Sequence, residues 1–165
     1  MRTVEVRLNL DAVAPLLDVI KGAIDGLRSG LAVDQQMPSP EADLADDWRA
    51  ELLQSQGDDL DVLLALFDRE FFLTGLVVFS DENSEPILRA CAAVRLRLRA
   101  TRLQTVGDEN LESGEVALAD MPEPERRVFA TYVFLATLQE LIVQHLDPTV
   151  PEEGQEDPGE QGDFE

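Results

Sequence analysis

The sequence has very few of the residues that build disulfides and transition-metal sites. It contains one cysteine, Cys91, and one histidine, His145. A single cysteine excludes an internal disulfide and every cysteine-rich zinc site, and a single histidine excludes the metal motifs that need two. The glycine-rich loops that bind phosphates and the G-x-S-x-G motif of hydrolases are absent too. We therefore expect no catalytic residue, no metal ligand and no cofactor.

Basic residues are scarce as well: Lys and Arg number 13 against 34 Asp and Glu, and the formal net charge is −21. This balance disfavours nucleic acid, whose binding rests on neutralised phosphates, and anionic membranes, which attract basic segments. The longest apolar stretch, residues 128–143, includes Gln139 and Glu140 and is shorter than the roughly 20 residues of a membrane span. Since the N-terminus lacks the apolar segment of a secretion signal, we expect a cytoplasmic protein with no membrane association.

The sequence does contain enough apolar residues for a core, since hydrophobic types make up 44% of its 165 residues. We expect a single helical domain over residues 1–147 and a disordered acidic tail over residues 148–165. The tail carries seven acids and no base, and the negative body of the protein repels it. Phe164, an aromatic residue near the end of this tail, is a candidate docking element for a basic partner.

Residues 3–8 alternate between polar and apolar side chains, with Val4, Val6 and Leu8 on one side. This period of two predicts a short, half-buried N-terminal β-strand. A lone strand would leave its backbone N–H and C=O groups unpaired. We expect it to pair with residues 115–118 or with the same strand of a second copy, and the second possibility predicts a homodimer.

The rest of the chain predicts a mainly α fold, a bundle of about five helices. One helix is expected between Asp11 and Gly30, and the others over residues 41–56, 58–79, 86–103 and 123–146. The last two are apolar on most sides and should form the centre of the bundle. Residues 73–79 are also rich in strand-forming types, so a strand there is the alternative.

Local signals predict where these helices begin and end. Asp11 and Asp58 are expected N-caps, Gly30 follows the end of the first helix, and Gly57 separates the second helix from the third. Two further glycines, Gly22 and Gly26, lie inside the first helix, where each costs up to about 1 kcal/mol relative to alanine. We interpret them as marks of close packing against another helix.

Three arginines, Arg95, Arg99 and Arg102, recur at helical spacing along one side of the expected 86–103 helix. They form a candidate site for an anionic ligand or for an acidic partner, because guanidinium groups bind carboxylate and phosphate in a planar fork. The alternative is that they pair with the chain's own carboxylates, which are in large excess.

The expected 123–146 helix carries Tyr132, Gln139 and Glu140 within its apolar pattern. We interpret these three as candidate buried polar residues that the core holds in position. A buried carboxylate needs a cation or bound donors. We therefore hypothesise an ion pair between Glu140 and an arginine of the stripe on the neighbouring helix.

Other polar groups favour a structural role. Four carboxylates between residues 43 and 51 share a helix face, but a di-metal bundle would also need Glu-x-x-His pairs, which are absent. Cys91 lies among apolar residues and is expected to be buried and inert. His145 lies near the end of the last helix, where a positive charge is favourable.

Three segments carry a family resemblance: residues 4–11, residues 88–103, and residues 132–143 with their Leu-Gln-Glu run at 138–140. Together they resemble the bacterial domain-of-unknown-function family DUF2017 over roughly residues 2–147. The resemblance implies a protein without an established activity, often encoded near a Clp-protease adaptor. The acidic tail after Pro148 is a departure from that family.

The expected function is that of a non-enzymatic interaction or regulatory module with an unidentified protein partner. A small-ligand binder or enzyme with a pocket near Arg95 and Arg99 is the first alternative. An acidic nucleic-acid mimic, or a DNA-linked regulator, is the second. Converging polar groups in a pocket would indicate the first alternative, whereas an apolar groove would indicate an interaction module.

Overall fold

The fold is mainly helical with a short strand pair, as the sequence predicts. The computed structural model describes residues 2–32, 42–104, 106–107 and 121–146. Its elements follow in the order β1 (Thr3–Arg7), α1 (Leu10–Leu27), α2 (Ala42–Ala65), α3 (Arg69–Thr74), β2 (Leu76–Ser80), α4 (Ser84–Thr101) and α6 (Glu123–Leu146). The predictions for the 148–165 tail and Phe164 lie outside the described residues. None of the helices described combines the length and the apolar character needed to cross a membrane.

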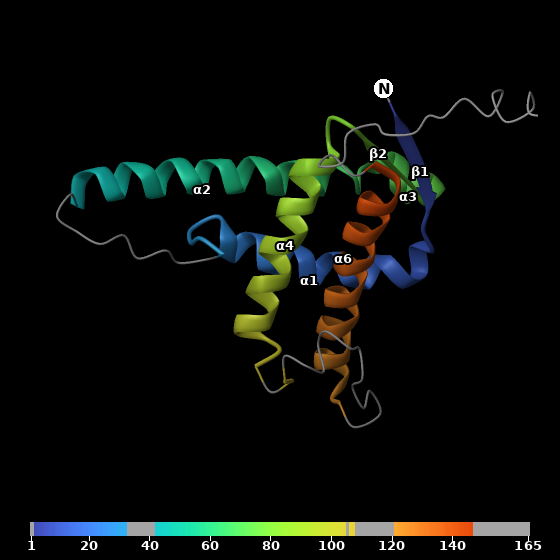
Figure 1. The fold of residues 1–165 in the computed structure, drawn as a ribbon. Coiled ribbons are helices and arrows are strands. Elements are labelled where there is room, and N and C mark those ends of the chain that lie inside the picture. Colours follow the sequence, from blue (N-terminus) through green and yellow to red (C-terminus); the bar gives the residue numbers. More distant parts are fainter. Residues whose placement is uncertain (1, 33–41, 105, 108–120, 147–165) are drawn as a thin grey trace, which may run out of the picture.

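The helices form two layers that cross each other. Figure 1 shows α4 and α6 side by side and antiparallel, with α1 crossing behind both and α2 crossing behind α4. Because α4 packs against α1, α2 and α6, it is the central helix of the fold. The N-terminal half of α2 extends beyond α4 and projects from the body (Figure 1). The sequence predicted the central position of α4 and α6 correctly.

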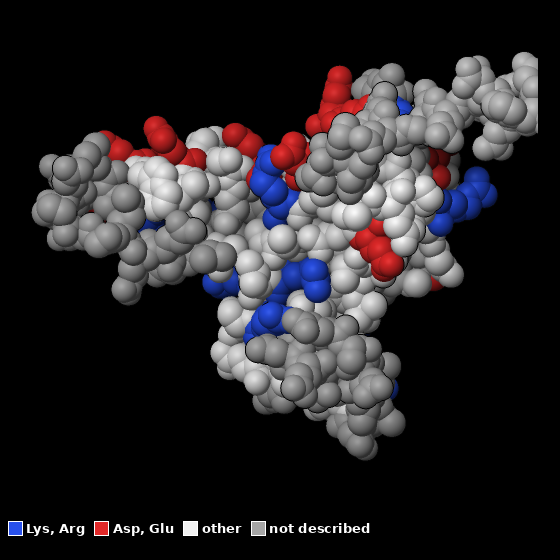
Figure 2. Space-filling view, viewed as in Figure 1, with Lys and Arg blue, Asp and Glu red and all other residues white. Residues whose placement is uncertain are grey.

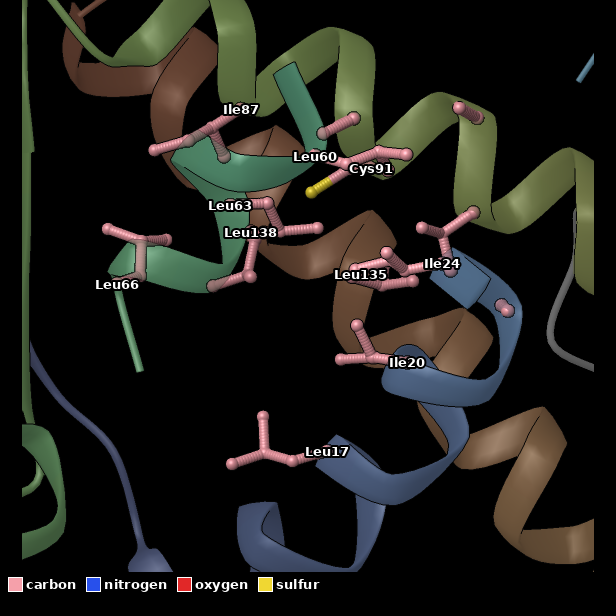
Figure 3. Packing of buried hydrophobic residues seen from close by; sticks show 14 of the residues in the cluster. Leu17, Ile20, Ile24, Leu60, Leu63, Leu66, Ile87, Cys91, Leu135 and Leu138 are labelled. Atoms are coloured by element: carbon pink, nitrogen blue, oxygen red, sulfur yellow. The ribbon is translucent and has the colours of Figure 1, made fainter. Parts of the chain in front are cut away.

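One apolar core joins the four long helices. Figure 3 shows its side chains converging from α1, α2, α4 and α6. Ile20, Leu63, Ile87 and Leu135, one from each helix, are completely shielded from solvent. Full burial of such a side chain contributes about 1.5–3 kcal/mol relative to exposure. The burial of the periodic apolar positions of each helix is therefore the main contribution that stabilises the contact between the layers.

The strand β1 pairs with β2 in an antiparallel ladder, with Thr3 opposite Ser80 and Arg7 opposite Leu76. The partner that the structure shows is therefore β2, a segment that the sequence analysis did not name as the partner of this strand. The strand alternative for residues 73–79 is correct, because α3 stops at Gly75, whose φ of +75° turns the chain out of the helix. The lone strand that motivated a homodimer thus has a partner within the chain.

The first helix begins and ends at residues other than those predicted. Asn9, not Asp11, is the N-cap of α1, because its side-chain oxygen accepts the N–H of Asp11 at 3.0 Å. The helix ends at Leu27 with Arg28 as its C-cap, so Gly30 plays no capping role. Close packing is confirmed at one of the two helical glycines: a Cβ on Gly26 would lie 2.6 Å from the Arg97 guanidinium, whereas a Cβ on Gly22 would meet nothing within 4 Å.

Helix α2 continues without interruption through Gly57, where the sequence predicted a break and a new cap at Asp58. Gln56 supplies the reason. Its amide nitrogen donates to the Leu27 carbonyl at 2.7 Å, and its amide oxygen accepts from the Ala32 N–H at 3.0 Å. These bonds fix α2 to the end of α1 and oppose the helix-breaking tendency of glycine, which amounts to about 1 kcal/mol.

Candidate functional site

Arg95 and Arg99 of α4 meet on the ring of Tyr132 in α6. Both donate hydrogen bonds to the tyrosine hydroxyl oxygen, from Nη2 of Arg95 at 3.2 Å and from Nη2 of Arg99 at 3.0 Å. Their central carbons lie 4.5 Å and 5.8 Å from the ring centre, which is the range of cation–π contacts. Figure 2 shows basic side chains gathered over α4, whereas acidic side chains lie along α2. The structure therefore brings together two of the three predicted arginines and one predicted buried residue.

Gln139 holds Arg95 in this position. Its amide oxygen accepts from Nη1 of Arg95 at 2.7 Å, and its amide nitrogen donates to the Leu88 carbonyl at 3.1 Å. Tyr132 is 3% exposed and Gln139 is half-buried. The core thus positions both residues as predicted, and their hydrogen bonds connect α4 to α6.

Two other predicted site residues lie elsewhere. Glu140 is exposed, and its carboxylate accepts a hydrogen bond from Gln144 at 3.2 Å. The predicted Glu140–arginine pair is wrong because one residue along a helix is a turn of about 100°, so the amide of Gln139, not the carboxylate, faces α4. Arg102 follows the last residue of α4, leaves the helical stripe and is exposed.

A groove of about 350 Å³ lies on another face of α4, between this helix and α2. Its walls are largely apolar, and Leu96 at its edge is 39% exposed. The α4 wall consists mainly of alanine, whose short side chains leave space between the two helices. The apolar lining includes Leu31, Ala32, Leu52, Ala92, Ala93 and Leu96.

An ion pair borders this groove. Arg89 of α4 donates to both carboxylate oxygens of Asp59 in α2, at 2.9 Å and 3.0 Å. Asp59 is 9% exposed, and its hydrogen bond holds the pKa of Arg89 above the ordinary value. A second carboxylate, that of Glu85, lies 3.4 Å from Arg89. The arginine charge at the groove is therefore neutralised by the protein itself.

The sequence contained a signal for this groove that the expected helix ends concealed. Leu52, Ser55 and Asp59 follow one another at helical spacing and line the same side of α2. The predicted break at Gly57 assigned Leu52 and Asp59 to two different helices, so their common face could not be recognised. The contacts of Gln56 with the end of α1, which favour a continuous helix, have no local signal in the sequence.

The remaining polar candidates are exposed side chains and do not form a site. Asp46, Asp47 and Glu51 are exposed on α2. His145 is exposed in the last turn of α6. In the described parts of the chain, no cluster of three or more His, Cys, Asp or Glu side chains is arranged to hold a metal ion.

Cys91 is expected to resist alkylation in the folded protein. The residue is completely buried, and desolvation raises the pKa of its thiol to about 12. Iodoacetamide near pH 8 should leave the native chain unmodified and add one group to the chain in denaturant, as seen by mass spectrometry. The thiol of Cys91 ionises at a lower pH in the unfolded chain than in the folded chain. Its ionisation therefore favours unfolding, and the free energy of unfolding falls as pH rises from about 9 towards 12. Rapid native labelling would contradict this prediction.

Comparison with known proteins identifies a family. A model of a domain of unknown function, DUF2017, matches residues 31–146, which contain the groove residues of α2 and α4 and the arginine cluster but not β1 or α1. No curated protein and no solved structure matches the chain. Since the match covers more than half of the sequence, the chain belongs to the DUF2017 family.

Proposed function

We propose that this chain is a non-enzymatic binding module that holds a short, basic, amphipathic helix of a partner protein in the groove between α2 and α4. The observation that carries the proposal is the groove itself, with its alanine and leucine walls and its satisfied Asp59–Arg89 ion pair. An apolar stripe on a helix fits such a space between two helices. The exposed Leu96 supplies an apolar contact at the edge.

The charge of the partner follows from the charge of α2. This helix exposes Asp46, Asp47, Glu51 and Asp58, and it also carries Asp61, which pairs with Arg28. Its one basic residue is Arg49. A basic helix is attracted to this surface, whereas a second copy of the chain would bring a further formal charge of −21. Charge complementarity thus favours a basic partner over self-association through the groove.

Trp48, the one tryptophan of the chain, gives an optical test. It is 37% exposed and lies one turn before the groove residue Leu52. A short amphipathic peptide of leucine and lysine is expected to shift the Trp48 emission to shorter wavelength in a saturable manner, because a bound helix covers this part of α2. The same peptide with glutamate in place of lysine should cause no shift. Equal shifts with both peptides would contradict the proposal.

Leu96→Ser is expected to weaken binding of the lysine peptide about tenfold or more. Burial of a leucine contributes about 1.5–3 kcal/mol, and about 1.4 kcal/mol corresponds to a factor of ten. Val133→Ser is the matched control, because Val133 is 41% exposed on α6 and Leu96 is 39% exposed on α4. Unchanged affinity in Leu96→Ser, or equal losses in both variants, would refute binding in the groove.

A further inference from the structure

Arg95 is an exception to the charge pattern of this molecule. Acids outnumber bases by 34 to 13, and Arg28 and Arg89 each pair with an aspartate. The hydrogen-bond partners of Arg95, in contrast, are the neutral groups of Gln139 and Tyr132. No ion pair between described residues includes Arg95. The predicted neutralisation by the chain's own carboxylates therefore does not occur at Arg95 in the part of the chain that the structure covers.

Arg95 also has unused hydrogen-bond donors. A guanidinium has five N–H groups, and two of those on Arg95 have an acceptor among the described residues. Its Nε atom is buried and has no hydrogen-bond partner there. A buried donor without an acceptor costs free energy, and a small rearrangement that let a ligand oxygen reach Nε would recover it.

The hydroxyl of Tyr132 is a second donor that lacks an acceptor among the described residues. Its oxygen accepts hydrogen bonds from Arg95 and Arg99, so its proton remains to be donated. The residue is 3% exposed, and its hydroxyl donates to none of the described residues. Two cations and a hydroxyl donor thus meet at one place between α4 and α6, and none of the described residues accepts the hydroxyl proton.

We infer that Arg95, Arg99 and Tyr132 form a receptor for the carboxylate of an acidic peptide segment. A guanidinium binds a carboxylate through parallel N–H groups, and partial burial strengthens the attraction. Near neutral pH inorganic phosphate carries between one and two negative charges, so the negative field of the protein opposes its approach more strongly than the approach of a single carboxylate. The receptor is independent of the groove between α2 and α4, because Arg95 does not line that groove.

The carboxylate has two possible sources with the same chemistry. One is an acidic segment of a partner protein. The other is this chain's own residues 151–165, which contain seven acids. A full-length variant in which these seven acids are replaced by their amides distinguishes the two. A changed Arg95 Nε–H signal in that variant would identify the internal source, and an unchanged signal together with a response to added peptide would identify the external source.

The test is an NMR titration of the full chain that follows the arginine Nε–H signals. The probes are a short serine peptide that contains one glutamate and has blocked ends, so that it carries a single negative charge, and, at equal ionic strength, inorganic phosphate. For an external source, the peptide should shift the Arg95 and Arg99 signals in a saturable manner, and phosphate should shift them far less. The inference is overturned if the Arg95 signal responds to neither the peptide nor the amide replacements, or if phosphate matches the peptide.

Two variants separate a receptor from general attraction to positive charge. Arg95→Gln is expected to lower the peptide affinity about tenfold, or to abolish the effect of the amide replacements if the source is internal. Tyr132→Phe keeps the ring and removes only the hydroxyl, so severalfold weaker binding in a folded protein is expected. Arg126→Gln, which removes an exposed charge from α6, should leave the affinity unchanged. Equal losses in Arg126→Gln and Arg95→Gln would overturn the inference.

Discussion

Phe71→Ala is expected to lower the free energy of unfolding by about 3–5 kcal/mol, which is the usual cost of removing a buried phenylalanine. Phe71 is completely shielded from solvent, and its ring centre lies 5.2 Å from that of Phe67 in an edge-to-face contact. Domains are stable by only about 5–15 kcal/mol, so this loss brings the protein close to unfolding. Urea denaturation followed by circular dichroism measures the effect.

Phe72→Ala is the matched control for this prediction. Phe72 is the next residue on α3, but it is 49% exposed. Its truncation should lower the free energy of unfolding by less than about 1 kcal/mol, as is usual for exposed positions. The two variants remove the same atoms from the same helix, so their difference measures burial. Equal losses would show that the face of α3 has been assigned incorrectly.

Gly75→Ala is expected to lower the free energy of unfolding by about 2–4 kcal/mol. The φ of +75° is unfavourable for an L-residue with a side chain, and a Cβ would lie 2.7 Å from the Leu8 carbonyl oxygen. Movement away from this contact would disturb the hydrogen bond from the Leu8 N–H to the Gly75 carbonyl, which measures 2.8 Å. Thermal and urea denaturation should both show the loss.

Gly22→Ala should have the opposite sign and provides the control. Gly22 lies within α1, and a Cβ there would meet nothing within 4 Å. Alanine loses less backbone entropy than glycine in a helix, so the free energy of unfolding should rise by up to about 1 kcal/mol. Destabilisation by Gly22→Ala would contradict the free space described at Gly22, and unchanged stability of Gly75→Ala would contradict the turn described at Gly75.

The elements that the sequence predicted well are those in which local pattern and burial agree. Helix α6 has the predicted limits, and α4 begins and ends two residues before the predicted positions. In α6 the apolar residues recur at helical spacing and are buried on that spacing, from Val128 to Leu146. The alternation of β1 likewise matches its half-buried pattern. In each case the local periodicity and the tertiary packing favour the same structure, so the periodicity alone is sufficient to predict the element.

The elements that were predicted wrongly depend on contacts between distant residues. Gln56 keeps α2 continuous through its bond to the Leu27 carbonyl, and Leu8 meets Gly75 where the chain enters β2. Neither contact has a local signature. At the arginine cluster the sequence located Arg95, Arg99 and Tyr132 but predicted the charged Glu140 as the partner of an arginine. In the structure Arg95 donates to the neutral Gln139, because the turn of the helix directs Gln139 towards α4. Composition could not reveal that choice.

The pairing of β1 with β2 also determines the order in which the protein can be completed during translation. Thr3 and Ser80 face each other across the sheet, and β1 also packs against α6, the last described helix. A ribosome adds about 5–20 residues per second, so the first strand waits roughly 4–15 s before β2 has even been made. During this interval Val4 and Val6 lack their partners in the sheet, Phe79 and Val77. The strand β1 is made before the other described elements and is thus among the last of them to reach its final environment.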